Sequence, residues 1–142
     1  MSEMHHPRRV LRRIGAVLAG LLAGIILSIG TDMVLHATGV FPPWGQPMGD
    51  SLFLLATAYR TVYAVVGSYI AARFAPDRPM QHALVLGVVG LAVSITGTVA
   101  TWDRGPAFGP KWYPLALIAL AMPSTWAGGR LLGVQLRARA DG

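Results

Sequence analysis

Long apolar stretches and short polar segments alternate along this chain. The alternation predicts four helices, at about residues 14–37, 51–74, 82–102 and 113–132, which contain almost no Asp, Glu, Lys or Arg. About 20 apolar residues allow a helix to span a bilayer, and each stretch reaches that length. Inside lipid only helices and closed barrels satisfy the backbone hydrogen bonds, and these unbroken runs lack the alternation of barrel strands. The pattern therefore predicts an all-α membrane protein with four transmembrane helices in a compact bundle.

The remaining polar segments are too short to form a domain of their own. We expect one transmembrane domain over residues 14–133, with a basic tail before it at 1–13 and another after it at 134–142. The loop after the first helix contains three prolines, which exclude a continuous helix there.

Charge distribution adds an orientation. The chain is 54% hydrophobic and 13% charged, against about 25% charged in a soluble domain. Most of the cations flank the predicted helices on one side only, namely Arg8, Arg9, Arg12, Arg13, Arg73, Arg78, Arg130, Arg137 and Arg139. Since cytoplasmic flanks carry the excess of Lys and Arg, both termini are predicted to be cytoplasmic. The net charge of +6 is then a feature of membrane insertion, and no nucleic-acid partner is expected.

Residue usage also favours a location. Arginine greatly outnumbers lysine, and Ala and Gly are abundant, which is typical of a high-GC bacterial gene. We therefore predict a bacterial inner membrane, with the lipid bilayer itself as one partner. There is no cysteine, so disulfides and thiolate metal sites are excluded.

The two halves of the chain show a weak internal similarity. "LSIGTDM" at 27–33 aligns with "VSITGTV" at 93–99, and "SYIAARF" at 68–74 aligns with "TWAGGRL" at 125–131. Both predicted hairpins start on the same side of the membrane, so a duplication would be of the parallel kind. Shared helix-hairpin composition is the alternative explanation, because the identities are few.

Small residues recur at helical spacing on two of the predicted helices. Helices in lipid associate through such residues because they let the backbones approach closely. The packing candidates are Gly20, Gly24 and Ser28 on the first helix and Gly87, Gly90, Ser94 and Gly97 on the third. We expect both faces to pack inward, either on each other or on another protein.

A proline lies near the middle of the fourth helix. Pro123 should free the carbonyl of Ala119 and bend the helix, and Ser124 or Thr125 could satisfy the opened backbone. The bend is interpreted as a packing kink, with a hinge as the alternative.

One polar constellation interrupts the apolar stretches. Asp32 and Arg60 lie about 9 Å and about 4 Å outward of the middles of their helices, at 1.5 Å per residue. Because a charge inside the bilayer usually pairs with another, we predict an ion pair between them. The site candidates are Asp32, His36, Thr57, Arg60 and Tyr63. The alternatives are a structural lock, a site for an anionic or zwitterionic ligand or proton relay, and a contact with another subunit.

No catalytic, phosphate-binding or metal-binding motif accompanies these residues. Neither a catalytic residue, a metal nor a cofactor is predicted. The preferred hypothesis is an accessory or structural subunit, in a homo-oligomer or with another membrane protein. The alternative is a small oligomeric transporter or channel that uses the charge pair to bind a solute or relay protons.

Overall fold

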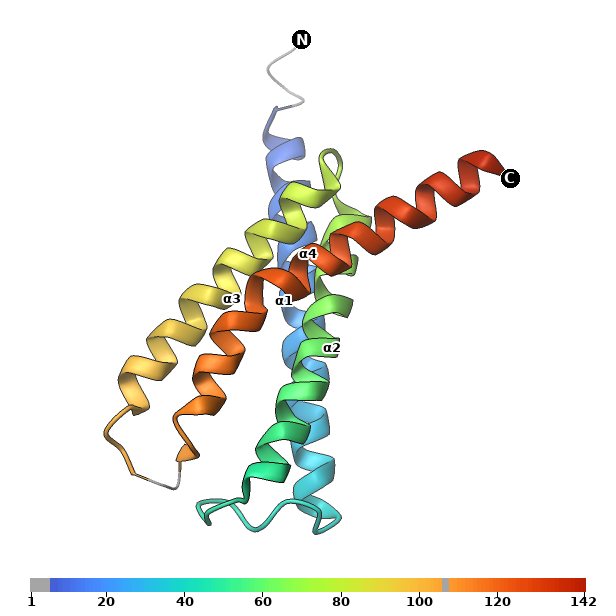
Figure 1. The fold of residues 1–142 in the computed structure, drawn as a ribbon. Helices are drawn as coiled ribbons and strands as arrows, with labels where there is room; N and C mark the ends of the chain where they lie inside the picture. The colour runs from blue at the N-terminus through green and yellow to red at the C-terminus, as the bar shows by residue number, and fades with distance from the viewer. Residues whose placement is uncertain (1–5, 106–107) are drawn as a thin grey trace.

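The computed structural model describes residues 6–105 and 108–142, which form four long helices (Figure 1). They are α1 (His6–Ala37), α2 (Asp50–Phe74), α3 (Pro79–Thr101) and α4 (Trp112–Asp141). These described ranges contain no strand. By length and composition, each helix is long and apolar enough to cross a membrane. The prediction of an all-helical chain with four helices of this kind is confirmed.

Two helices are longer than the apolar stretches that predicted them. α1 begins at His6 rather than near residue 14, and α4 ends at Asp141 rather than near residue 132. Most of each predicted basic tail is therefore helical. Arg, Leu and Ala have high helix propensity, so the helix continues where the apolar pattern stops. The pattern marks the part of a helix suited to lipid and not the end of the helix.

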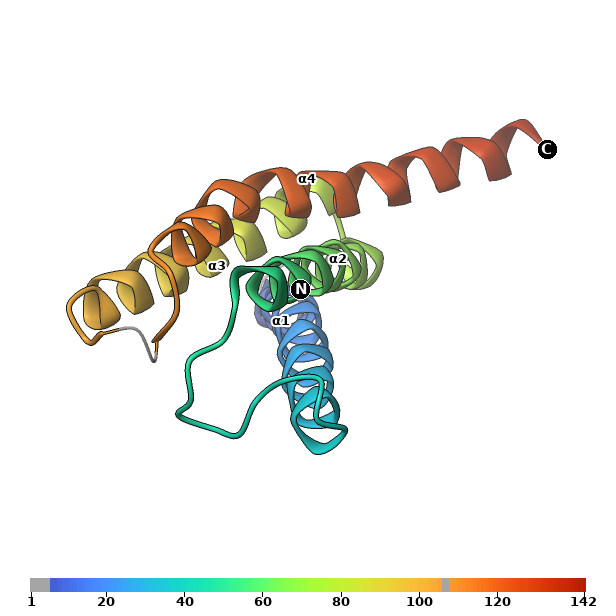
Figure 2. The ribbon, with the colours of Figure 1, turned by 60° about the horizontal axis from the view of Figure 1, so that its bottom comes forward.

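The helices form an open arc in the order α1, α2, α4, α3. α2 packs against α1 and α4, α3 packs mainly against α4, and α1 and α3 share few contacts. The start of α1 and the end of α4 lie at one end of the molecule, here called the terminal end, together with the loop at 75–78 (Figure 1). The loop after α1, the end of α3 and the start of α4 lie at the opposite end, the loop end (Figure 1). Figure 2 shows that the last part of α4 extends beyond the other helices, so the molecule is less compact than the predicted bundle.

Small residues on α2 explain its central place. A Cβ at Gly20 of α1 would collide with the carbonyl oxygen of Gly67, and a Cβ at Gly128 of α4 would collide with the Ser68 hydroxyl. Gly67 and Ser68 are adjacent in sequence and therefore point to different sides of α2. Each side has a second small residue four positions on, Ala71 or Ala72, and both of these are buried. α2 thus presents two close-packing faces at once.

The predicted packing stripes are only partly used within the chain. Gly87 is tightly packed against Thr125 of α4, whereas Gly24 is at ordinary contact distance, 3.7 Å, from the Tyr63 carbonyl oxygen. A Cβ at Gly90 or Gly97 would meet nothing within 4 Å. Within the single chain, therefore, only part of the α3 stripe is closely packed, and contact of the rest with another protein stays a prediction. The α1–α3 side of the arc is open, so no helix of this chain reaches that part of α3.

α4 remains continuous through Pro123, and Figure 1 shows that it changes direction along its length. The hydroxyl of Ser124 donates to the carbonyl of Leu120 at 2.5 Å, and that of Thr125 to the carbonyl of Ala121 at 3.0 Å. Neither hydroxyl bonds to the carbonyl of Ala119 that the sequence suggested. In a helix these short side chains reach back four residues, which brings them to carbonyls one or two positions further along.

An ion pair joins α1 to the loop between α2 and α3 at the terminal end. Arg13 donates from Nε and Nη2 to the two carboxylate oxygens of Asp77, at 3.1 Å and 2.5 Å. These hydrogen bonds hold the pKa of the Asp77 carboxyl below its usual value. The basic segment of α1 therefore has a structural contact as well as charge.

Candidate functional site

Asp32 on α1 and Arg60 on α2 form an ion pair. Arg60 Nη2 donates to Asp32 Oδ2 at 2.5 Å, and the two side chains are 34% and 18% exposed, respectively. The long arginine side chain spans the difference in depth between the two positions. Because α1 and α2 run side by side at this level, the pair ties the first hairpin together.

Tyr59 completes the pair and was missed by the sequence analysis. Its hydroxyl donates to Asp32 Oδ1, so each carboxylate oxygen accepts from a different residue of α2. The predicted candidates Thr57 and Tyr63 lie three residues before and after Arg60, whereas Tyr59 is adjacent to it. A carboxylate on a neighbouring helix can also accept hydrogen bonds from two residues that are adjacent in sequence, because its two oxygens point in different directions. The signal in the sequence was a tyrosine directly before the arginine, which offers a second donor to the same carboxylate.

Two predicted members lie outside this arrangement. The Tyr63 hydroxyl is 2.7 Å from Thr31 Oγ1, forming a second hydrogen bond between α1 and α2. The buried Thr57 donates to the carbonyl of Phe53 on its own helix at 2.9 Å. The structure therefore places Tyr63 one turn from the ion pair in a separate bond and leaves Thr57 bonded within its own helix.

His36 contacts Asp32 through the backbone and not through the carboxylate. Its Nδ1–H donates to the Asp32 carbonyl oxygen at 2.7 Å. The ring stacks on Trp44, with centroids 3.6 Å apart and planes 6° apart, and meets the edge of Phe41 at 5.3 Å. Since a carbonyl oxygen only accepts, Nδ1 carries the proton in this hydrogen bond.

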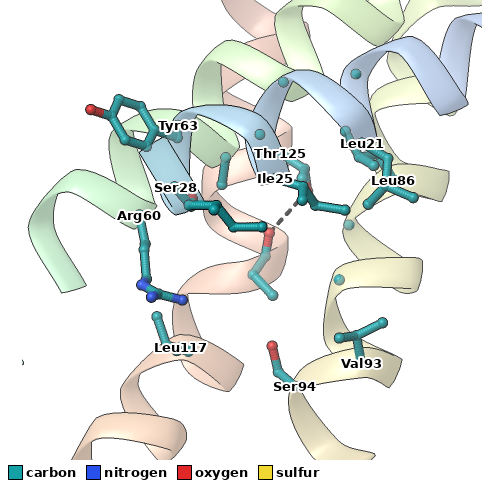
Figure 3. Close-up of a pocket in the computed structure, with 18 residues that line it drawn as sticks. Leu21, Ile25, Ser28, Arg60, Tyr63, Leu86, Val93, Ser94, Leu117 and Thr125 are labelled. Atoms are coloured by element: carbon teal, nitrogen blue, oxygen red, sulfur yellow. Dashed lines mark hydrogen bonds between the residues drawn. The ribbon is translucent and has the colours of Figure 1, made fainter. Parts of the chain in front are cut away.

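Arg60 lies between two cavities. One, the α1–α3 cleft, has a volume of about 390 Å³ and is seen in Figure 3. Its walls include predicted packing residues of both helices, which are Gly20, Gly24, Ser28, Gly87, Gly90 and Ser94. Figure 3 also shows Leu21 and Ile25 of α1 across from Leu86 and Val93 of α3, with the Arg60 side chain extending toward Leu117. The cleft is therefore apolar apart from one cation and a few hydroxyl groups.

The other cavity lies at the loop end and measures about 200 Å³. Asp32, Tyr59 and Arg60 line it together with His36. Five of the eleven other lining residues are aromatic and come from both hairpins and the first long loop, namely Phe41, Trp44, Phe53, Phe108 and Tyr113. This loop-end cavity is thus a small aromatic chamber with a pair of opposite charges at one side.

The guanidinium of Arg60 is not fully satisfied by these contacts. Its Nε is buried and has no hydrogen-bond partner among the described residues. The Arg60 carbon Cζ lies 6.0 Å from the Tyr59 ring centroid, at the outer range of a cation–π contact. One donor of the guanidinium therefore remains without a partner among the described residues.

In the described part of the chain, no group of three or more His, Asp or Glu side chains is placed so that it could hold a metal ion. The second half carries no copy of the charge pair either. Thr98, the position that aligns with Asp32, donates to the Ser94 carbonyl of its own helix at 2.6 Å. The polar site belongs to the first hairpin alone, and the origin of the two hairpins by duplication stays a hypothesis.

The fold and site define a chain of four helices suited to a membrane, with a polar site between two cavities. No protein-family model, curated protein or solved structure matches this chain.

Proposed function

We propose that this chain is an integral protein of a bacterial inner membrane with both termini in the cytoplasm. Outward-facing apolar side chains cover all four helices, among them Ile26 at 66% and Val99 at 75% exposed. A soluble protein rarely exposes such large apolar areas, whereas lipid tails cover them at no cost. The terminal end carries the Arg-rich flanks, which is the distribution found on the cytoplasmic side.

Within that membrane the chain acts as an accessory or structural subunit. The observation that carries this proposal is the α1–α3 cleft, an apolar cavity whose walls include Gly24 and Ser28 of α1 and Gly90 and Ser94 of α3. Small residues at helical spacing are typical of surfaces that receive another transmembrane helix. The occupant we propose is a helix of a larger membrane protein, seated between α1 and α3.

A second candidate, a small oligomeric transporter, has one observation in its favour. Arg60 lines both the α1–α3 cleft and the loop-end cavity, which places the ion pair beside the path that a solute would take in a transporter. In this case, Arg60→Gln protein that still folds would lose solute flux in proteoliposomes. An accessory subunit would show no flux with or without Arg60.

Blocking the cleft tests the accessory role. Gly90 lines the cleft and has open space at its Cβ, so Gly90→Leu fills the cavity without a clash at that atom. Gly133 also has open space but lies outside the cleft, which makes Gly133→Leu the matched control. Gentle extraction should recover the same membrane partner with the wild type and Gly133→Leu and lose it with Gly90→Leu.

A photoactivatable residue then identifies what lies in the cleft. Ile25 lines it, whereas the adjacent Ile26 points elsewhere on α1. A cross-link from position 25, and not from 26, should map to a transmembrane helix of that partner. Cross-links from position 25 to lipid only, or to a second copy of this chain, would overturn the proposal.

A further inference from the structure

The first long loop folds back over the charge pair. Phe41 is 3% exposed, and its N–H donates to the Leu35 carbonyl oxygen at 3.0 Å, which anchors the start of the loop on the end of α1. Trp44, further along the loop, stacks on His36 and remains 70% exposed. The loop thereby builds a wall of the loop-end cavity instead of extending away from the helices.

The polar groups in this cavity are few and lie together. Asp32 and Arg60 retain part of their surface, 18% and 34%, although they are bonded to each other. Tyr59 lies beside them, and the wall otherwise consists largely of apolar residues, among them five aromatic rings. An apolar, concave chamber with a small number of convergent polar groups is the usual form of a small-molecule site.

The charges of the pair restrict the ligand. A simple anion near Arg60 would be repelled by the Asp32 carboxylate, and a simple cation near Asp32 would be repelled by the guanidinium. A molecule that carries both charges presents its anionic end to Arg60 and its cationic end to Asp32, and it adds no net charge to a poorly hydrated site. Electrostatics therefore favour a zwitterion.

The aromatic wall restricts the ligand further. Phe, Tyr and Trp faces attract organic cations, and aromatic rings grouped around a cavity recognise quaternary ammonium groups in particular. Phe53 and Tyr113 already lie close together, with ring centroids 5.0 Å apart. The volume of about 200 Å³ is below the range of about 300–1,000 Å³ for drug-sized ligands, so the molecule must be small.

We propose that the loop-end cavity binds a small zwitterion of the betaine type, with its carboxylate on Arg60 and its quaternary ammonium against Asp32 and the aromatic wall. The site is separate from the α1–α3 cleft and does not depend on the accessory role. It gives the charge pair a second task beside joining α1 to α2.

Binding of radiolabelled glycine betaine to the purified chain in phosphatidylglycerol nanodiscs tests this proposal. These nanodiscs contain no zwitterionic headgroup that could compete. Two competitors each carry one half of the ligand: tetramethylammonium has the cation alone, and tert-butylacetate has the anion on a skeleton of the same shape. We expect saturable binding that each half-ligand displaces at least about tenfold less well than unlabelled glycine betaine, since each loses one charged contact.

Variants of Trp44 test the aromatic wall without altering the ion pair. Trp44→Ala should weaken binding about tenfold, and Trp44→Phe should largely retain it. Trp126→Ala is the matched control, because Trp126 is also exposed, at 52%, but lies on α4 outside the cavity. Gly90→Leu should leave binding unchanged, which separates this site from the cleft.

The proposal is overturned by any of three results. The first is a lack of saturable binding. The second is displacement by either half-ligand that is as effective as displacement by unlabelled glycine betaine. The third is equal affinity of Trp44→Ala and Trp126→Ala for glycine betaine. Loss of the membrane partner in Gly90→Leu protein that still binds glycine betaine would support both proposals independently.

Discussion

Asp32 is the residue on which the polar site is built, because it accepts hydrogen bonds through three oxygens. Its carboxylate accepts from Tyr59 and Arg60, and its backbone carbonyl accepts from His36. A carboxylate with both oxygens bonded tolerates an apolar surrounding, whereas an isolated one does not. Arg60 is therefore tolerated in an apolar helix because it pairs with Asp32. Asp32 is tolerated because donors from Tyr59, Arg60 and His36 satisfy its oxygens.

A double-mutant cycle measures how strongly the ion pair couples the two helices. An uncompensated charge in a bilayer costs about 2.5–3.5 kcal/mol, so Asp32→Asn and Arg60→Gln should each lower the free energy of unfolding by about 2 kcal/mol. The double variant should lose less than the sum, with a coupling of about 1 kcal/mol or more. Unfolding from mild detergent into a denaturing detergent gives these values. Strictly additive losses would show that the pair does not stabilise the hairpin.

The two tyrosines of α2 provide a matched comparison. Tyr59 donates to a carboxylate and Tyr63 bonds to a threonine hydroxyl. Hydrogen bonds to charged groups contribute about 1.5–3 kcal/mol and neutral ones about 0.5–1.5 kcal/mol, so Tyr59→Phe should destabilise more than Tyr63→Phe. Thermal unfolding of both proteins in the same detergent checks the order, and a larger loss for Tyr63→Phe would contradict it.

At the scale of elements, glycine contacts set the packing of the helices. Helices in lipid gain little from burying apolar side chains, so close backbone approach supplies the attraction. Gly20 with Gly67 joins α1 to α2, and Gly128 with Ser68 joins α4 to α2. These contacts position the charge pair, because they determine how far α1 and α2 are separated.

Alanine substitutions on α1 separate packing glycines from the rest. A Cβ at Gly20 would strike the carbonyl oxygen of Gly67, and a Cβ at Gly15 would meet nothing within 4 Å. Gly20→Ala should therefore destabilise by about 1–3 kcal/mol through overpacking, whereas Gly15→Ala should be neutral or stabilise slightly. The detergent unfolding assay measures both. Equal effects would show that α1 and α2 are not in close contact at Gly20.

The contact between Arg13 and Asp77 predicts a pH dependence. Hydrogen bonding to Arg13 lowers the pKa of Asp77 in the folded chain below the ordinary value of 3.8. The contribution to stability is therefore complete above that value and is lost as the pH falls through the lower folded pKa. Asp77→Asn should be less stable than the wild type at pH 6, and the difference should shrink below about pH 4. Melting temperatures of both proteins across this range give the comparison, and a constant difference would refute the linkage.

At the scale of the whole molecule, orientation in the membrane is the property with the clearest test. The chain contains no cysteine, so a single introduced cysteine reports on one site only. Gln46 is exposed in the loop end, and Ala140 is exposed near the C-terminus. In spheroplasts, a membrane-impermeant maleimide should label Gln46→Cys readily and Ala140→Cys only after lysis. The opposite pattern would reverse the proposed topology.

The overall arrangement also shows how far the sequence could predict this structure. The number and type of the helices followed from apolar length, and the pairing of Asp32 with Arg60 followed from the cost of an isolated charge. The extent of α4 did not follow, since its polar end continues as helix. Tyr59 was missed because its role depends on how α1 crosses α2, which no spacing within α2 reveals.

The sequence by itself determined which segments are helices suited to lipid and which charged residues need partners. Both are local properties, governed by the transfer of side chains out of water and by backbone hydrogen bonding within one segment. Only the tertiary structure decided that α2 is central, that the α1–α3 side is open and that an aromatic chamber covers the charge pair. Those features depend on contacts between residues far apart in the chain, such as Gly20 with Gly67 and Phe53 with Tyr113, whose geometry is set by the packing of whole helices.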